Sequence, residues 1–178
     1  MEKKRNQMCI LGIVLILLLL AYFGMQFREE RKEEQEQKET EQNTVYVTEL
    51  DEITAFSYDI GNGELGFELQ DGVWTYVEDT DFPLAQGYPQ QIADEFRRLA
   101  STRYIENADE PAAYGLDAPA YKILLTDANG KEVQLYFGNA VGEDYYVMNP
   151  ETAEIYTVNS GVVADLQYTL DEMAQLDD

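Results

Sequence analysis

The chain of 178 residues has no histidine, and its single cysteine, Cys9, lies close to the N-terminus. Residues 45–178 therefore contain neither imidazole nor thiol, which excludes disulfides, thiolate or imidazole metal ligands, and catalysis by cysteine or histidine from that part. Basic residues are also scarce there: five Lys and Arg stand against 27 Asp and Glu, a net charge of −22. This charge argues against nucleic acid or anionic lipid as a partner.

One long apolar run, MCILGIVLILLLLAYFGM, occupies residues 8–25. As a helix it would be about 27 Å long, close to the hydrocarbon thickness of a bilayer. Bulky residues follow the run where a signal peptidase needs small ones, and Cys9 stands at the wrong end for a lipoprotein signal. The sequence therefore predicts an uncleaved transmembrane anchor at residues 8–27.

The orientation of this anchor depends on charge. Basic residues are nearly balanced on its two sides, but a short basic tail at residues 1–7 directly precedes it, as in export signals. A strongly acidic domain is also repelled by the anionic cytoplasmic leaflet. We therefore expect a single-pass protein of the cell membrane, with a cytoplasmic tail (1–7), a charged stalk (28–44) and an extracytoplasmic domain (45–178).

From residue 45 onward, short β runs alternate with turn signals. Strands are expected at 53–60, 64–70, 73–77, 102–106, 121–126, 131–137, 145–148 and 154–158. Asn-Gly and Asp-Gly pairs between them supply the positive φ angles of tight hairpins. Amphipathic helices are expected at 89–100 and from Asn159-Ser160 onward, the second with an apolar stripe of Val163, Leu166, Leu170 and Met173. The pattern predicts an α+β domain of antiparallel β-meanders with packed helices on one face.

The two halves of this domain resemble each other. Residues 56–69 align with 124–137 at an offset of 68, which matches Phe56 with Leu124. One interpretation is an internal duplication of a β-meander–helix unit, at about 53–106 and 120–173. The other is that any two hairpins with half-buried strands look alike.

The most specific motif is Tyr114-Gly115-Leu116-Asp117-Ala118-Pro119, followed by Phe137-Gly138-Asn139 and Tyr145-Tyr146-Val147. With Trp74 upstream, it resembles the bacterial family known as domain of unknown function 4340, over roughly residues 53–170. The resemblance implies a membrane-anchored protein without established enzymatic activity, and some members look like partners of ABC-type transport systems. It carries over no catalytic residue.

The residues of this motif also have a physical interpretation. Gly115 and Gly138 are expected where a Cβ would strain the backbone, and Pro119 fixes the entry to the strand that follows. We therefore expect an architectural role for the motif, namely for Tyr114, Gly115, Leu116, Asp117, Pro119 and Gly138.

Aromatic residues are the feature most suggestive of binding, since 12 of the 13 tyrosines follow residue 44. Tyr145 and Tyr146 are neighbours on a predicted strand, so their side chains should point to opposite faces. Together with Trp74 they form the candidate binding surface, because aromatic residues are favoured in interfaces. The β propensity of tyrosine accounts for the same enrichment without a ligand.

No Gly-rich phosphate loop and no G-x-S-x-G elbow is present, and we expect no enzyme, no cofactor and no metal site. The leading hypothesis is an exported domain that binds or scaffolds, as an accessory to an envelope ABC-type transport system. Two alternatives stay open. The first is a calcium-dependent structural module, because acidic residues cluster around Asp127 and at 78–81. The second is a carboxylate-dependent cell-wall glycan hydrolase, because the domain has many carboxylates that could form a catalytic pair.

Overall fold

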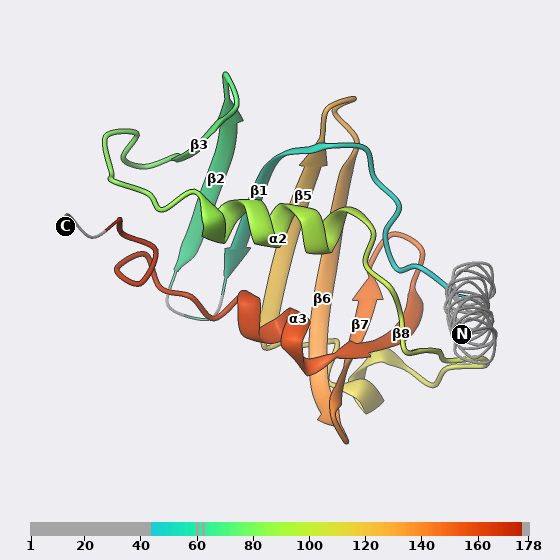
Figure 1. Cartoon of the computed structure of the whole chain (residues 1–178). Coiled ribbons are helices and arrows are strands. Elements are labelled where there is room, and N and C mark those ends of the chain that lie inside the picture. Colours follow the sequence, from blue (N-terminus) through green and yellow to red (C-terminus); the bar gives the residue numbers. More distant parts are fainter. Residues whose placement is uncertain (1–43, 60, 62, 176–178) are drawn as a thin grey trace, which may run out of the picture. The chain divides into compact units, whose positions relative to one another are not determined.

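The computed structural model describes residues 44–59, 61 and 63–175 (Figure 1). The predicted cytoplasmic tail and transmembrane anchor lie outside these residues, as does the predicted stalk except for Thr44. Within the described part, no helix is long and apolar enough to cross a membrane. The chain divides into two units between Thr44 and Val45, and the account below concerns the second unit.

A single antiparallel sheet dominates this unit. Its eight described strands follow the order β3-β2-β1-β5-β6-β7-β8-β4. The strands are β1 (Ile53–Asp59), β2 (Glu64–Gln70), β3 (Val73–Tyr76), β4 (Arg103–Tyr104), β5 (Tyr121–Asp127), β6 (Glu132–Val141), β7 (Asp144–Asn149) and β8 (Glu154–Asn159). The predicted α+β class is therefore confirmed, and every expected strand is present.

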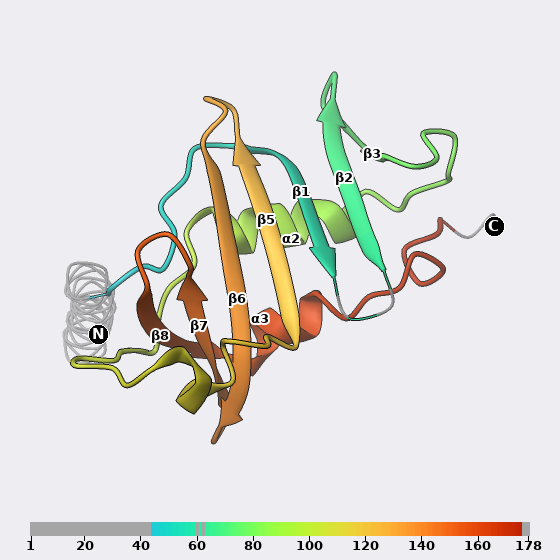
Figure 2. The same ribbon diagram turned by 180° about the vertical axis from the view of Figure 1, so that it is seen from behind.

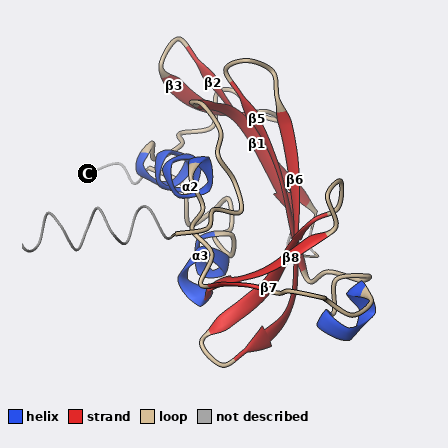
Figure 3. Ribbon diagram, turned by 90° about the vertical axis from the view of Figure 1, so that its right-hand side faces the viewer, coloured by secondary structure: helices blue, strands red, loops and turns tan. Residues whose placement is uncertain are grey.

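Two helices, α2 (Gly87–Arg97) and α3 (Ser160–Asp165), cover the same face of the sheet (Figure 3). We call this the inner face. The short 3₁₀ helix η1 (Pro111–Tyr114) lies on the opposite, outer face. The helix α2 begins two residues before Pro89, which sits in the first turn where its missing N–H is not needed.

The second predicted helix is shorter than its apolar stripe indicated. Asn159 caps it as expected, since its side chain accepts from the Gly161 N–H at 2.9 Å. However, α3 ends at Asp165, and a new turn starts at Thr169, whose carbonyl accepts from the Glu172 and Met173 N–H groups. There the Glu172 carboxylate accepts from the Thr169 N–H at 2.8 Å, and the Glu172 N–H donates to Thr169 Oγ1 at 3.4 Å, which together make a capping box. Because this box starts a separate turn, the stripe does not continue as one helix.

The main core lies between the inner face and the two helices. The largest fully buried aromatic side chains are Tyr58, Phe67, Phe96 and Phe137. The Phe96 ring of α2 meets the Phe137 ring of β6 edge-on, with centroids 6.2 Å apart. Each fully buried side chain of this size contributes roughly 1.5–3 kcal/mol by removing apolar surface from water. This contact therefore fixes α2 to the middle of the sheet.

The pairing of β1 with β5 places the two predicted halves side by side and corrects their alignment. Phe56 pairs with Leu125, and both are buried, whereas Leu124 pairs with Ser57 on the outer face. The offset of 68 is thus wrong for this strand, although it holds for Phe67 and Leu135, which are both buried. The second hairpin turn is one residue shorter, and a shift of one residue reverses the faces.

The two halves are also interlocked. The strand β4, from the first half, pairs with β8 at the far edge of the sheet. In return, the C-terminal segment packs against the first meander: the Tyr58 hydroxyl donates to the Tyr168 carbonyl at 2.9 Å, and the Ala85 N–H donates to the Met173 carbonyl at 2.8 Å. A duplication origin stays a prediction, but neither half is a separate module.

A side chain protects the exposed edge of the sheet at β3. The Trp74 N–H donates to Gln86 Oε1 at 2.8 Å, and Gln86 Nε2 donates back to the Trp74 carbonyl at 2.9 Å. The amide thus pairs with the strand as a neighbouring backbone would. Such edges otherwise template aggregation, so Gln86 blocks strand addition at this point.

Substitution Gln86→Ala should lower the free energy of unfolding of the full-length protein by about 2 kcal/mol, because two backbone hydrogen bonds are lost. It should also increase concentration-dependent self-association. Urea unfolding followed by the fluorescence of Trp74, the chain's single tryptophan, measures the first effect, and light scattering measures the second. The control Gln70→Ala, at an exposed position of β2, should change stability by less than about 0.5 kcal/mol. Equal effects of both substitutions would contradict this role of Gln86.

Candidate binding face

The predicted aromatic surface is not assembled in the structure. Trp74 is only 3% exposed and belongs to the main core, and its indole N–H donates to Gln90 Oε1 at 3.1 Å at the edge of that core. Tyr145 and Tyr146 do point to opposite faces, as predicted: Tyr145 packs against the main core, and Tyr146 against a second cluster. The structure therefore does not bring these three residues together on one surface, and β propensity and packing account for their positions.

The second cluster lies on the outer face beneath the segment 105–119. Its buried members are Leu116, Met148 and Ile155, and the Tyr114 ring meets the Tyr146 ring with centroids 4.8 Å apart. Leu116, from the Tyr114–Pro119 motif, is 1% exposed. The motif therefore fastens the segment 105–119 over β7 and β8.

Two glycines make this close packing feasible. Gly115 ends η1 with φ at 74°, in the left-handed region that favours glycine. A Cβ on Gly138 would lie 2.2 Å from the Tyr114 carbonyl oxygen, so only glycine fits there. Pro119 is half-buried two residues before β5, and Asp117 is exposed with no side-chain hydrogen bond to any described residue. The structure thus gives Asp117 no visible part in the motif.

Substitution Gly138→Ala should lower the free energy of unfolding by about 2 kcal/mol, since the backbone at Tyr114 must move away. The control is Gly87→Ala, where an added Cβ meets nothing within 4 Å. This control should leave stability unchanged or raise it by up to about 1 kcal/mol. Urea unfolding of both variants measures the difference, and a Gly138→Ala variant as stable as the control would contradict the packing argument.

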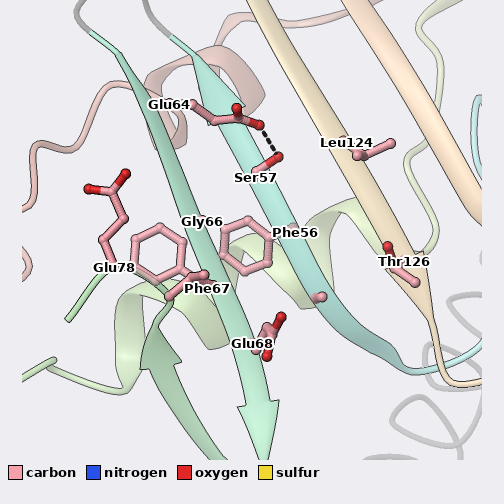
Figure 4. Close-up of a pocket in the computed structure, with 11 residues that line it drawn as sticks. Phe56, Ser57, Glu64, Gly66, Phe67, Glu68, Glu78, Leu124 and Thr126 are labelled. Atoms are coloured by element: carbon pink, nitrogen blue, oxygen red, sulfur yellow. Dashed lines mark hydrogen bonds between the residues drawn. The ribbon is translucent and has the colours of Figure 1, made fainter. Parts of the chain in front are cut away.

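The remaining part of the outer face, over β3, β2, β1 and β5, is not covered by any described element (Figure 2). We call this region the open face. Its centre is a shallow hollow of about 290 Å³ (Figure 4). Small residues form the floor, namely Ala55, Ser57 and Gly66, and Val77 and Leu124 stand on its two sides. Val77 is 51% exposed, as is Val73 on the same strand edge.

Carboxylates surround this hollow. Glu64 and Glu68 lie on β2 on either side of Gly66, and Glu78 follows Val77. The Ser57 hydroxyl donates to Glu64 Oε1 at 2.6 Å, which holds that carboxylate beside the floor (Figure 4). No lining residue is basic. The hollow is therefore apolar at its centre and negative at its rim.

A second hollow, also of about 290 Å³, lies between α2 and the strands β1, β2 and β3. Trp74 and Leu69 line its wall, and Glu52, Asp94 and Arg97 line its mouth. The acids of both hollows are exposed. Among the described residues the one buried carboxyl belongs to Asp127, at 4% exposure, and it lines neither hollow. The described part thus places no pair of buried carboxylates in a hollow.

A family model described as "Domain of unknown function (DUF4340)" matches residues 74–175, more than half of the chain. The chain belongs to the DUF4340 family. The match confirms the resemblance seen in the Tyr114–Pro119 motif, although it starts at Trp74 rather than near Ile53. No curated protein and no solved structure was found to match the chain. The strands β1 and β2 of the open face therefore precede the matched DUF4340 region.

The β5–β6 turn lies within the DUF4340 match. It contains the acids around Asp127 for which calcium binding was an alternative. The Asp127 carboxylate accepts from the backbone N–H groups of Lys131 and Asn129, both at 2.9 Å. These bonds, that from Lys131 foremost, hold the pKa of the carboxyl below its ordinary value. Among the described residues, no three acidic side chains gather as a metal site would require. The Asp127 side chain closes the hairpin.

This contact predicts a pH dependence of stability. Because the folded-state pKa of Asp127 is lowered, its contribution is present above the ordinary value of 3.8 and is lost as the pH falls through the folded-state pKa. Substitution Asp127→Asn should therefore destabilise the DUF4340 domain at pH 7, and the difference from wild type should shrink below about pH 4. The urea midpoints of wild type and variant, measured at pH 7 and below about pH 4, give this difference in stability. A difference that does not depend on pH would contradict the assignment.

Proposed function

We propose that this protein is a single-pass envelope protein whose anchor holds an extracytoplasmic domain that binds or scaffolds another protein. An ABC-type transport system is the partner class that the family resemblance suggests. The apolar run at residues 8–25 and the net charge of −22 after residue 44 support the location. The domain's role is supported by its own surface.

The observation that carries the proposal is the composition of the open face. A solvated sheet face normally alternates polar side chains outward. Here the outward positions at its centre are Ala55, Ser57, Gly66, Val77 and Leu124, and only Ser57 among them is polar. Exposed patches of this kind, rimmed by polar residues, are typical of protein interaction sites. The acidic rim adds specificity, since charges around an apolar centre select partners and orient them.

No specific observation favours the two alternatives. A glycan hydrolase needs two carboxyl groups facing each other across a cleft that holds the substrate. The acids of the two hollows are exposed, and the turn at Asp127 is held by backbone N–H donors. Binding through the open face is therefore the function we prefer.

In-cell photo-crosslinking tests this function. A photo-reactive amino acid at Val77 of the full-length protein should capture an envelope protein, because this side chain is 51% exposed beside the hollow. The same amino acid at Glu151, an exposed position of the β7–β8 turn, is the matched control and should capture several-fold less. Mass spectrometry identifies the captured protein and the crosslinked segment. Recovery of no membrane or wall protein, or equal capture from both positions, would contradict the proposal.

A further inference from the structure

We propose that the hollow on the open face receives a lysine or arginine side chain from a basic segment of the partner protein. This inference rests on the proposed function and specifies the chemistry of the partner. Three observations support it: the floor contains a glycine that the packing of the domain does not require, the hollow has the shape of a trough, and the residues at its rim are negatively charged.

Gly66 is a glycine that the fold itself does not require. Its φ is not positive, and a Cβ there would lie 3.5 Å from Val77 Cγ2, an ordinary van der Waals contact. Glycine weakens the interior of a strand, where it marks a bulge, a bend or the close approach of a ligand or another backbone. No register shift interrupts the pairing of β1 with β2 at this position. Close approach by a ligand or by the backbone of another chain is the explanation that remains.

The shape of the hollow suits an extended aliphatic stem. Ser57 pairs with Gly66 and also with Leu124, and the Val77 N–H donates to the Gly66 carbonyl at 2.9 Å. Val77 and Leu124 thus stand on the two sides of a floor of small residues. With strands about 4.8 Å apart, this trough is roughly 14 Å wide between backbones. The methylene stems of lysine and arginine bury well on such apolar surface.

The rim supplies the charge that such a stem requires. Glu64 and Glu68 are four residues apart on β2, roughly 13 Å along the strand, so one lies toward each end of the trough. Ser57 holds one oxygen of Glu64, and no described donor hydrogen-bonds the other. The nearest lysine on this face, Lys122, has its ammonium over the Tyr136 ring, 5.7 Å from the centroid. Gln70 Nε2 donates to Glu68 Oε2 at 3.3 Å, and the Tyr76 hydroxyl donates to Glu78 Oε2 at 2.8 Å. Each rim carboxylate thus keeps one oxygen for a cation from outside.

Charge also selects among the occupants of the open face. A second copy of this chain would bring another domain with a net charge of −22, and anionic lipid would be repelled in the same way. A basic protein segment is attracted by the domain as a whole and by the rim of the hollow. We therefore commit to a basic segment as the occupant.

A defined peptide tests this without knowledge of the partner. The probe is acetyl-Ala-Ala-Arg-Ala-Ala-amide, titrated into the full-length protein in an uncharged detergent at about 0.15 M salt. Methyl NMR signals of Val77 and Leu124 should shift and saturate. The same peptide with citrulline, which has the shape of arginine without its charge, should bind at least about tenfold more weakly.

Two variants locate the binding site. The double substitution Glu64→Gln and Glu68→Gln should weaken peptide binding about tenfold. Glu143→Gln with Glu151→Gln changes the net charge equally at exposed positions outside the hollow and should leave binding unchanged. Gly66→Val should fill the floor and abolish the shifts, while the urea midpoint stays the same or rises, because valine favours strands.

The outcomes separate this inference from the proposed function. Equal binding of the citrulline peptide, equal loss in the control pair, or no saturable shift up to several millimolar peptide would each overturn cation recognition. Capture of an envelope protein from Val77 would still support binding through the open face in those cases. If crosslinking captures nothing while the arginine peptide binds as expected, the proposed function fails and the hollow's preference for cations stands.

Discussion

The antiparallel pairing of β1 with β5 is the contact on which this domain depends. It joins Phe56 to Leu125 and Tyr58 to Ile123, and all four side chains are buried on the inner face. The hairpins on either side are local, but this pair must bring together residues far apart in sequence. Loop-closure entropy makes such long-range pairing slow and unfavourable until it buries apolar surface. The helix α2, laid across the inner face, and the C-terminal segment, bonded to Tyr58, provide that burial.

The path of the chain determines which parts of the sheet are covered. The chain must travel from β3 at one edge to β4 at the other, and this crossing carries α2 over the inner face (Figure 1). It must then return from β4 to β5 in the middle, and the segment 105–119 makes this return over the outer face of β6, β7 and β8 (Figure 2). No described connection crosses the outer face of β1, β2 and β3. The topology of the chain thus leaves the open face uncovered. Topology does not determine which residues lie on that face, and polar residues there would have been compatible with the same fold.

Much of the local structure could be predicted from residue patterns alone. Asn129-Gly130 and Asp71-Gly72 determine their hairpins because positive φ angles are required there, and Gly130, Gly72 and Asp71 adopt them. The start of the helix after Asn159 could be predicted, but its apolar stripe gave no sign of its end, where Thr169 and Glu172 begin a separate turn. The burial of Trp74 could not be predicted, since it depends on partners distant in sequence. Trp74 looks like an interface residue until Gln90 and Phe56 are placed beside it. The hollow itself had no sequence signal, because its floor comes from separate strands whose register is known only after pairing.

Gly66 and Gly138 show why such a site escapes prediction from sequence. Both are glycines inside strands, where local preference disfavours them. Gly138 is explained by the Tyr114 carbonyl, which would lie 2.2 Å from an added Cβ, so the residue serves the packing of the domain. Gly66 has no such neighbour, and the domain would gain strand propensity from almost any other residue at that position. Where local preference is set aside without a gain in packing, function is the remaining explanation. The distinction between the two glycines can be drawn only from the contacts of the folded chain.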